Sequence, residues 1–532
     1  MKILVISLYS FATPHFQTEL ELIEGHLEKS DEVYVLHCDS ELKTCSYNPT
    51  KKLGNCYHCK VTFKKGFDIL DKKNQIKFIP FLKEKQHNID IKYDFEDIDE
   101  LKKYKINGID FGMAAASSIT SQLRDHRFST KKYRERVKVT LETSVNVYYT
   151  LEKYISELKP DIAYLFNGRP AELRAALRAC QAKGVKIYTH ERGATMYKYD
   201  LFEETTPHDF EYVQNEIERY WVNGSSDKTA ISEDWYLKRR QGIEIDWISF
   251  IKDQKQDHLP NNFSKDKKNI GIFISSEDEF AAIEEIDMTS ELYIEQTDAV
   301  KDIAEYFKDD NSIHFYLRVH PNLKAVDNSQ VRDIKSLENM NFPNLTVIHA
   351  ESVIDTYALI DNCDKIITFG STTGLEAVIA NKPSILVGNK WGNYYNKLDV
   401  VYMPASREEF FSLIKNKLEP KNRLGAHKYG YWAATHGFDH KNYQATSFTT
   451  GSYNNIVIDV NFSQLIIRKT LILGNIIKLL SNFGNQKTIF KIFSDRKNQK
   501  MIFGIIINKN EKFKTKFRNI FSLLVTSLNN SK

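Results

Sequence analysis

The amino-acid sequence predicts an α/β protein built from two Rossmann-like domains and a basic helical tail. A chain of 532 residues is longer than a domain with a single hydrophobic core usually is, so at least two domains are expected. Short apolar segments alternate with amphipathic ones over most of the chain, which is typical of parallel sheets covered by helices. A polar segment at 253–268, with Pro260 near its centre, separates two such halves and predicts a linker.

The first half of the chain, residues 1–250, is expected to form the first Rossmann-like domain. Its apolar segments have the length of strands, and the amphipathic segments between them repeat with the period of a helix. Pro160 and Gly184 follow two helical segments, as residues that end helices do. The expected strands span 3–8, 32–37, 161–166 and 186–189, and the main helices span 132–158 and 170–183.

The second half, residues 269–440, repeats the alternation more regularly and is expected to form the second domain. Two Rossmann-like halves joined by a linker are typical of the architecture called GT-B, in which two domains face a cleft. The same pair of domains serves sugar-nucleotide epimerases, so this fold alone does not establish an activity. The expected strands span 270–274, 314–319, 345–349, 365–368 and 384–387, and the helices span 298–307, 331–340, 353–361 and 374–380.

Charge is distributed unevenly along the chain. Residues 464–532 contain 14 Lys and Arg against Asp495 and Glu511, a balance of +12. Because the whole chain carries +4, the remaining body has a balance of −8. Apolar residues recur at helical spacing among the basic residues of this tail, and basic amphipathic helices bind anionic membrane surfaces. A tail helix packed on the body with its lysines exposed is the alternative.

The overall composition is that of a globular protein, with 42% hydrophobic and 27% charged residues. No run of about 18 apolar residues is present, so no membrane-spanning helix is predicted. The first strand runs into a polar helical segment without a signal-peptide cleavage site. We therefore expect a cytoplasmic protein, peripheral on the inner face of the plasma membrane. No nucleic-acid recognition motif accompanies the basic charge, so nucleic acid is not an expected partner.

Residues that follow strands carry the most information, because ligands of open α/β sheets bind at the carboxyl ends of strands. In the second half, residues 318–321 (Arg-Val-His-Pro) end one strand, and Pro321 restricts His320 to an extended backbone. Residues 369–374 (Phe-Gly-Ser-Thr-Thr-Gly) form a turn before a helix, where glycines, hydroxyl groups and a helix N-terminus suit a phosphate. The alternatives are a structural histidine and an ordinary helix cap. A third segment, 275–279, closes the first strand of this half.

Together these segments resemble the capsule polysaccharide biosynthesis family, which includes the Kdo transferases of capsule assembly. The resemblance covers roughly residues 270–415 and rests on the segments 318–321, 364–377 and 381–388. The His-Pro pair and the Ser/Thr pair are also similar to the nucleotide-binding motifs of bacterial sialyltransferases and polysialyltransferases. In those families, the two motifs bind the CMP part of the nucleotide-sugar donor.

The resemblance implies a donor site in the second domain. By this resemblance His320 contacts CMP, the hydroxyl groups of residues 371–373 hold its phosphate, and Glu376 lies near the ribose. The predicted donor-binding residues are Arg318, His320, Pro321, Gly370, Ser371, Thr372, Thr373 and Glu376.

The first half is expected to supply the acceptor site and the catalytic side chains. Asn167 and Arg169 follow one predicted strand and Glu191 follows the next, so all three are expected to face the cleft. Glu191 is the predicted ionisable group, either as a base on an acceptor hydroxyl or as a carboxylate that stabilises positive charge at the sugar. A buried Arg–Glu pair that braces the domain is the alternative. Serines at 117–118 with charged residues at 124–127 could bind an anionic acceptor, but a solvated helix face is the favoured interpretation.

Four of the six cysteines lie within 22 residues, in the pattern Cys-x6-Cys-x10-Cys-x2-Cys. Disulfides are not expected in a cytoplasmic chain. Four thiolates satisfy a closed tetrahedral zinc site, and Cys-x2-Cys is a common spacing in zinc knuckles. Ordinary buried or exposed thiols are the alternative. The predicted ligands of a structural zinc ion are Cys38, Cys45, Cys56 and Cys59.

These observations predict a glycosyltransferase that moves a sugar from a CMP-activated donor to a growing surface polysaccharide or glycolipid. Kdo or a related acidic sugar is the expected donor sugar. No Asp-x-Asp motif is evident in a strand context, so no cofactor is expected in catalysis. A UDP-sugar 2-epimerase-like enzyme and a non-catalytic component of a polysaccharide assembly complex are the alternatives. The basic tail favours the transferase, because an epimerase acts on soluble substrates.

Overall fold

The computed structural model divides the chain into two compact units. One unit contains Met1–Pro49 and Thr62–Ile458, and the other contains Thr50–Val61 and Asp459–Lys532. Both Rossmann-like domains belong to the larger unit, which the following description concerns. The predicted basic tail, 464–532, lies outside the described residues except at four positions. The structure describes residues 1–81, 89–245, 247–283, 292–388, 394–461, 464–465 and 468–469.

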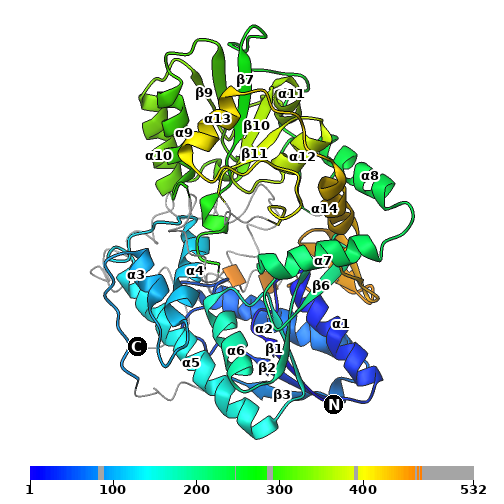
Figure 1. Ribbon diagram of the computed structural model, residues 1–532. Helices are drawn as coiled ribbons and strands as arrows, with labels where there is room; N and C mark the ends of the chain where they lie inside the picture. The colour runs from blue at the N-terminus through cyan, green and yellow to red at the C-terminus, as the bar shows by residue number, and fades with distance from the viewer. Residues whose placement is uncertain are drawn as a thin grey trace, which may run out of the picture. The chain divides into compact units, whose positions relative to one another are not determined.

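The first domain is built on a sheet of seven strands in the order β12-β6-β5-β4-β1-β2-β3 (Figure 1). The strands from β5 to β3 are parallel, and β6 and β12 are antiparallel additions at one edge. The four strands predicted for this half are all present, whereas the sequence patterns do not predict β3, β6 and β12. The strands span Lys2–Ser7 (β1), Glu32–His37 (β2), Lys77–Pro80 (β3), Ile162–Phe166 (β4), Lys186–Arg192 (β5), Lys198–Glu203 (β6) and Phe438–Asp439 (β12).

Helices of the first domain end where the local sequence predicts. Helix α5 ends at Leu158, and Lys159 adopts a left-handed backbone with φ 49° just before Pro160. Helix α6 ends shortly before Gly184, whose φ is 65°. The helices span His15–Glu28 (α1), Leu53–Ile69 (α2), Ile98–Lys103 (α3), Phe111–Leu123 (α4), Arg134–Leu158 (α5), Ala171–Ala182 (α6), Phe210–Val222 (α7) and Lys228–Arg240 (α8), with a 3-10 turn at Lys73–Gln75 (η1).

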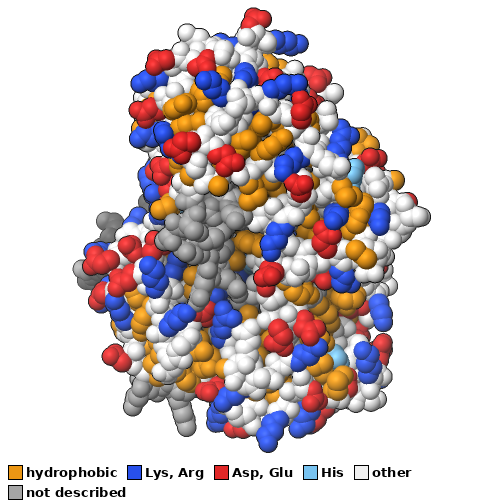
Figure 2. All heavy atoms as spheres, in the orientation of Figure 1, with side chains coloured by type: hydrophobic (Ala, Val, Ile, Leu, Met, Phe, Trp, Pro, Cys, Tyr) orange, Lys and Arg blue, Asp and Glu red, His pale blue; other side chains and the backbone are white. Residues whose placement is uncertain are grey.

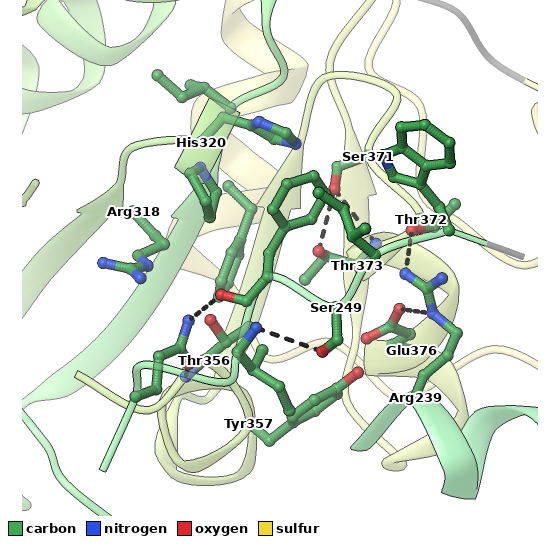
Figure 3. Close-up of a pocket in the computed structure, with 18 of the residues that line it drawn as sticks. Arg239, Ser249, Arg318, His320, Thr356, Tyr357, Ser371, Thr372, Thr373 and Glu376 are labelled. Carbon is green, nitrogen blue, oxygen red and sulfur yellow. Dashed lines mark hydrogen bonds and ion pairs between the residues drawn. The ribbon is translucent and has the colours of Figure 1, made fainter. Parts of the chain in front are cut away.

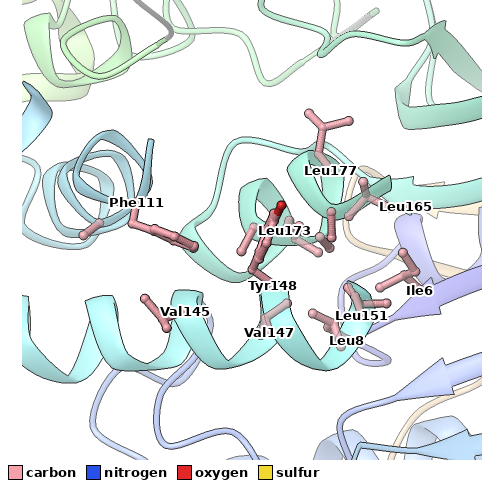
Figure 4. Close-up of a cluster of buried hydrophobic side chains, with 14 of the residues drawn as sticks. Ile6, Leu8, Phe111, Val145, Val147, Tyr148, Leu151, Leu165, Leu173 and Leu177 are labelled. Atoms are coloured by element: carbon pink, nitrogen blue, oxygen red, sulfur yellow. The ribbon is translucent and has the colours of Figure 1, made fainter. Parts of the chain in front are cut away.

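The core of the first domain lies between its parallel strands and the helices that cover them. β1 is buried from Ile3 to Ser7, as a continuous apolar strand of a doubly covered sheet should be. Ile6 of β1 belongs to the same buried cluster as Leu151 of α5 and Leu177 of α6 (Figure 4). This packing fixes the carboxyl ends of β1, β4 and β5, where the residues predicted for catalysis lie.

The second domain is built on five parallel strands in the order β11-β10-β7-β8-β9 (Figure 1). The chain adds β8 and β9 on one side of β7 and then β10 and β11 on the other, so the switch point lies between β7 and β10. All five predicted strands are confirmed. The elements span Lys268–Phe273 (β7), Glu277–Glu279 (η2), Gln296–Tyr306 (α9), Ile313–Arg318 (β8), Pro321–Leu323 (η4), Ser329–Asn339 (α10), Leu345–Ile348 (β9), Thr356–Asn362 (α11), Lys365–Thr368 (β10), Thr373–Ile379 (α12), Ser384–Leu386 (β11) and Arg407–Lys415 (α13).

After the second domain the chain returns to the elements of the first half. Helix α14 (Leu424–Thr435) packs against α7 and α8, and β12 pairs with β6 of the first sheet. The hairpin of β13 (Tyr443–Ser447) and β14 (Thr450–Tyr453) follows, and its buried tyrosines join the core beside β1. The predicted end of the second domain at residue 440 is therefore too late, because β12 belongs to the first sheet.

Figure 2 shows one face of the protein, on which basic and acidic side chains are interspersed. This mixture agrees with the small net charge of the chain outside its tail. Among the helices that the structure describes, none has both the length and the apolar composition needed to cross a membrane.

Candidate functional site

A pocket of about 210 Å³ lies at the carboxyl ends of β7, β8 and β10 in the second domain (Figure 3). Parallel strands bring their carboxyl ends to one edge of the sheet, so segments far apart in the sequence meet there. Seven of the eight predicted donor-binding residues line this donor-side pocket, and Gly370 directly precedes three of them. The seven are Arg318, His320, Pro321, Ser371, Thr372, Thr373 and Glu376.

His320 follows β8 and offers a neutral hydrogen-bond donor to the pocket. The backbone N–H of Asn322 donates to Nδ1 of His320 at 3.2 Å, which places the ring proton on Nε2. Burial lowers the pKa of His320 to about 4, so the imidazole is neutral at pH 7. The ring of Phe250 lies at 66° to the imidazole, with centroids 5.7 Å apart, and limits its movement.

Two glycines shape the turn between β10 and α12. Gly370 has a φ of 90°, a backbone region that favours glycine. Gly374 packs against the sheet so closely that a Cβ would lie 2.8 Å from Oη of Tyr395 and 2.9 Å from Oγ1 of Thr368. The three residues between these glycines are therefore held on a fixed backbone at the edge of the pocket.

The side chains of this turn present hydroxyl groups. Oγ of Ser371 donates to Oγ1 of Thr373 at 3.0 Å and accepts from the backbone N–H of Thr373 at 3.3 Å. Thr372 occupies the N-cap position of α12 without a capping hydrogen bond from its side chain. Because α12 has only seven residues, its helix dipole is short, and the hydrogen-bond donors that the turn offers to the predicted phosphate are its hydroxyl groups.

Arg318 borders the pocket, but its guanidinium binds backbone carbonyl oxygens within the second domain. Its guanidinium donates to the carbonyl oxygens of His349 at 2.8 Å and Ser352 at 3.3 Å. In Figure 3 the guanidinium points away from the turn that contains Ser371. Arg318 thus holds the loop after β9, and its contact with a nucleotide stays a prediction.

Glu376 has a partner that the sequence patterns do not predict, Arg239 of α8. Nε of Arg239 donates to Oε1 of Glu376 at 3.0 Å, and NH2 lies 3.4 Å from Oγ1 of Thr372 (Figure 3). Arg239 and Glu376 are 137 positions apart in the sequence. The only local signal is the basic run at the end of α8, which is also typical of ordinary helix C-termini.

The segment that connects the two domains forms an apolar wall of the same pocket. Trp247, Ile248 and Phe250 line it although each is at least 36% exposed. The guanidinium of Arg192 lies 4.5 Å from the centre of the Trp247 ring, which fixes this part of the segment against β5. These residues lie at the end of the predicted first domain, before the predicted linker at 253–268, and the sequence patterns do not predict this wall.

A second pocket, of about 350 Å³, lies in the first domain at the end of β4. Hydroxyl and amide side chains dominate its lining, and two aromatic rings, Tyr47 and Phe166, contribute apolar faces. Asn167 and Arg169, predicted for catalysis, line this acceptor-side pocket, whereas Glu191 is not among its lining residues. The lining is Ser46, Tyr47, Ser117, Ser118, Ser121, Gln122, Phe166, Asn167, Arg169, Pro170 and His208.

Asn167 and Arg169 form a tight turn at the end of β4. Asn167 has a φ of 57°, and its Oδ1 accepts from the backbone N–H of Arg169 at 3.0 Å. The guanidinium of Arg169 donates to Oγ of Ser117 at 2.9 Å and to the carbonyl oxygens of Glu279 at 2.9 Å and Asp278 at 3.3 Å. Burial lowers the pKa of Arg169 to about 10, so it stays charged while it bridges the two domains.

Glu191 lies behind Asn167, whose Nδ2 donates to Oε2 of Glu191 at 2.8 Å. Burial raises the pKa of Glu191, but the His15 ring, the Asn167 amide and the backbone N–H of Arg192 outweigh this and lower it. Nε2 of His15 lies 3.5 Å from Oε1 of Glu191. Burial lowers the pKa of His15 to about 3, so this imidazole is neutral at pH 7. Glu191 is therefore ionised at neutral pH, which is the form that both predicted roles, base and charge stabiliser, require.

His208 is a pocket residue that the sequence analysis misses. Burial, followed by the charge of Arg169, lowers its pKa to about 3, so it is neutral at pH 7. Its Nε2 lies 3.5 Å from Nδ2 of Asn167. No strand-end motif surrounds His208, and the sequence offers no signal that separates it from other histidines.

The loop after α4 joins the two domains and is not the solvated face that the sequence favours. Ser117 and Ser118 are buried, and Oγ of Ser118 accepts from the first backbone N–H of α6 at 2.7 Å. Nε2 of His126 lies 3.0 Å from Oε2 of Glu277 and 2.8 Å from Oε2 of Glu295. The predicted solvated face is wrong for Ser117, Ser118 and His126, which are buried, whereas Arg127 is exposed.

His126, Glu277 and Glu295 are also the one group of potential metal ligands found within 4.8 Å of one another among the described residues. Nε of Arg127 lies 3.5 Å from Oε1 of Glu295. Burial lowers the pKa of His126, but Glu295 and Glu277 outweigh this and raise it. Burial raises the pKa of Glu277, whereas burial of Glu295 is outweighed by the His126 ring, which lowers its pKa. Glu295 is therefore the main counter-charge to His126 and Arg127, and the group is explained as an ion-pair cluster between the domains.

The cysteines predicted to bind zinc are not part of that group. Cys38 and Cys45 follow β2 in the larger unit and are half-buried. Cys56 and Cys59 lie on the part of α2 that belongs to the smaller unit. A zinc site formed by these four residues stays a prediction.

The fold and the donor-side pocket together define a two-domain α/β protein of the GT-B type, as predicted. Residues 285–396 match the family described as capsule polysaccharide biosynthesis protein. This segment contains β8, β10 and the strand-end residues that line the pocket, so the chain is similar to that family over the part that forms the pocket. The resemblance stated from the sequence is confirmed over this segment.

Several solved structures are similar to the chain at low sequence identity. A beta Kdo 2,4 transferase, KpsC of Thermosulfurimonas dismutans, is 13% identical, with 51% of this chain and 79% of that chain covered and a TM-score of 0.35. The UDP-GlcNAc 2-epimerase of Neisseria meningitidis is 14% identical, with 81% and 98% covered and a TM-score of 0.27. Similarity at this level does not indicate which reaction this chain catalyses. No curated protein matches the chain.

Proposed function

We propose that this protein is a glycosyltransferase of capsule polysaccharide synthesis that transfers a sugar from a CMP-activated donor to a surface polysaccharide or glycolipid. The donor-side pocket is the observation that supports this proposal most directly. It gathers His320 and the Ser371–Thr373 turn, and the family match at 285–396 covers both segments. We propose Kdo or a related acidic sugar as the sugar of the donor.

In this proposal the donor nucleotide binds in the donor-side pocket. The Nε2–H of His320 and the hydroxyl groups of Ser371 and Thr372 donate hydrogen bonds to the phosphate oxygens. The apolar wall of Trp247, Ile248 and Phe250 covers the base and the ribose. We propose that catalysis uses no cofactor and that side chains of this pocket supply the hydrogen bonds to the phosphate.

The acceptor binds in the acceptor-side pocket of the first domain. Its serine hydroxyls and its amide groups match the hydrogen-bonding pattern of a saccharide, which carries many hydroxyl groups that both donate and accept. The rings of Tyr47 and Phe166 offer apolar faces for the C–H side of a sugar ring.

The chemical step exchanges one C–O bond for another. The bond between the anomeric carbon and the phosphate oxygen breaks, and CMP leaves with the electron pair of that bond. The acceptor hydroxyl oxygen bonds to the anomeric carbon, and the hydroxyl proton leaves to solvent or a base. Positive charge develops at the anomeric carbon, and ionised Glu191 is the proposed group that stabilises it.

We further propose two roles from the sequence. The basic tail, 464–532, holds the enzyme at the anionic inner face of the plasma membrane, where a glycolipid acceptor would lie. The cluster of four cysteines holds one structural zinc ion, which takes no part in the chemical step.

Separate incubations with CMP-Kdo and UDP-N-acetylglucosamine test the proposal. Release of CMP together with transfer of Kdo to a saccharide acceptor supports a transferase. Conversion of the UDP-sugar to its 2-epimer without an acceptor would identify an epimerase instead, and absence of turnover and binding with both would favour an assembly component. The double variant Ser371→Ala/Thr372→Ala serves as the control, because it removes two hydroxyl donors while the glycines of the turn stay in place.

A further inference from the structure

The donor-side pocket needs a positive charge if it binds a nucleotide phosphate, because hydroxyl groups and a neutral histidine do not neutralise an anion. Among the described residues that line this pocket, two carry a permanent positive charge, Arg239 and Arg318. Arg318 is 3% exposed and donates to two backbone carbonyls of its own domain. Moving it to a ligand would leave those buried carbonyls without their donors, which is costly.

Arg239 lies where the phosphate is expected. Its NH2 is 3.4 Å from Oγ1 of Thr372, the central residue of the hydroxyl-bearing turn. Its Nε donates to Oε1 of Glu376 in the first turn of α12. The guanidinium carbon also lies 4.9 Å from the centre of the Trp235 ring, and Trp235 is 2% exposed. One edge of the guanidinium is therefore fixed by Glu376 (Figure 3), and one face is fixed by the buried Trp235 ring.

We infer that Arg239 is the residue that binds the phosphate of the donor nucleotide by charge-assisted hydrogen bonds, with Glu376 as its positioning residue. This inference rests on the proposed function and adds a residue from outside the segment that matches the family. Arginine suits this role because its planar guanidinium donates several N–H groups in a fixed geometry that matches phosphate oxygens. Glu376 holds Nε, and the NH2 group then faces the turn.

The Arg239 guanidinium reaches the pocket from helix α8, which is not part of the second sheet. The hydroxyl group of Tyr236, on the same helix, donates to the carbonyl oxygen of Ala426 in α14 at 2.8 Å. Gly430 of α14 lies so close to α8 that a Cβ there would lie 2.3 Å from Oγ of Ser232. The close packing of α14 on α8 thus fixes the helix, so Arg239 enters the pocket from a rigid support.

The neighbouring Arg240 provides a matched control on the same helix. Arg240 pairs with Asp361 of α11, and its guanidinium carbon lies 4.7 Å from the centre of the Tyr357 ring. It is not among the residues that line the donor-side pocket. Loss of Arg240 therefore removes a similar ion pair and ring contact without removing charge from the pocket.

The test compares CMP with cytidine, which differ in the phosphate, on the full-length protein by ligand-observed NMR and calorimetry. Arg239→Gln is expected to weaken CMP binding roughly ten- to hundredfold and cytidine binding less than twofold. Arg240→Gln is expected to change neither affinity more than twofold. If Arg239→Gln lowers the melting temperature strongly, Arg239→Lys is measured, and a severalfold loss for CMP with unchanged cytidine affinity is expected.

Each other outcome contradicts the inference in a distinguishable way. An equal loss for CMP and cytidine in Arg239→Gln would make Arg239 a structural residue. Unchanged CMP affinity in Arg239→Gln, or in Arg239→Lys where that variant replaces it, would overturn the inference while the proposed donor site stands. If the parent protein binds neither CMP nor UDP, both the proposed function and the role of Arg239 are wrong.

Discussion

Replacing His320 by alanine removes the hydrogen-bond donor whose protonation state the structure fixes. The imidazole is neutral because burial lowers its pKa to about 4, and its proton is on Nε2 because Nδ1 accepts from Asn322. The substitution therefore removes one N–H donor and no charge. The substitution also removes the acceptor of the Asn322 backbone N–H, which caps the 3-10 turn. The backbone hydrogen bonds from Leu323 to His320 and from Lys324 to Pro321 remain, so the loop is expected to keep its conformation.

The expected cost follows from the kind of hydrogen bond that is lost. A hydrogen bond between a neutral donor and a charged phosphate contributes about 1.5–3 kcal/mol, and about 1.4 kcal/mol corresponds to a tenfold change in affinity. His320→Ala is therefore expected to weaken CMP binding roughly ten- to hundredfold. Loss of the contact with the Phe250 ring adds a smaller stability cost, which is common to liganded and free protein.

Calorimetry with CMP measures this effect directly, and His349→Ala is the matched control. His349 follows the neighbouring strand β9, is exposed, pairs with Glu338 and does not line the pocket. The control is expected to bind CMP as the parent does. Equal CMP affinity in His320→Ala and the parent would refute the assignment of this pocket to the donor phosphate.

Four further predictions concern catalysis, acid stability, the tail and zinc. Glu191→Gln is expected to slow transfer at least tenfold with CMP affinity unchanged, because the charge acts on the sugar and not on the nucleotide; a parallel loss of CMP affinity would contradict this. His15 is neutral in the folded protein and gains a proton near pH 6.5 when unfolded, so the free energy of unfolding should fall as the pH is lowered from 6.5 to about 3. In urea titrations, His15→Gln should flatten this dependence by up to about 1.4 kcal/mol per pH unit, and an unchanged slope would contradict the buried neutral state. Truncation after residue 463 is expected to abolish salt-sensitive binding to anionic liposomes, while transfer to a soluble acceptor persists. Equal liposome binding with and without the tail would contradict the role of the tail. A truncation near residue 451 is unsuitable because it removes the buried Tyr453. Metal analysis of protein purified without chelator should find about one zinc per chain and less in Cys59→Ser, and absence of zinc with unchanged stability in that variant would exclude the site.

The sequence predicts the two parallel sheets well because their strands are continuous apolar segments bounded by turn residues. Lys198–Glu203 (β6) and Phe438–Asp439 (β12) are missed because their residues alternate weakly and are mostly half-buried or exposed. β6 pairs with β5 nearby in the sequence, but the pairing of β12 with β6 joins residues more than 200 positions apart. The end of the second domain is misplaced for the same reason, since local patterns do not show that β12 returns to the first sheet.

The candidate site is predictable only where it follows strands. The rule that strand ends converge correctly places His320 and the Ser371–Thr373 turn in one pocket. The same rule does not find Arg239, because its charge comes from a helix and reaches the pocket by tertiary packing. It also assigns Arg169 to catalysis, since a strand-end arginine has the same sequence context whether it contacts a substrate or a neighbouring domain.

The contacts of Arg169 connect the two pockets through a continuous series of hydrogen bonds. Oδ1 of Asn167 accepts from the backbone of Arg169, and the guanidinium of Arg169 donates to the carbonyl oxygen of Glu279. The carboxylate of Glu279 accepts from Nδ2 of Asn322 at 2.7 Å, and the backbone of Asn322 donates to His320. Asn322 thus orients the His320 imidazole in the donor-side pocket. Asn322 itself is bound by Glu279, whose backbone carbonyl accepts from Arg169 of the acceptor-side pocket. Arg169 is therefore better explained as a residue that positions the donor site than as one that contacts the reacting sugar.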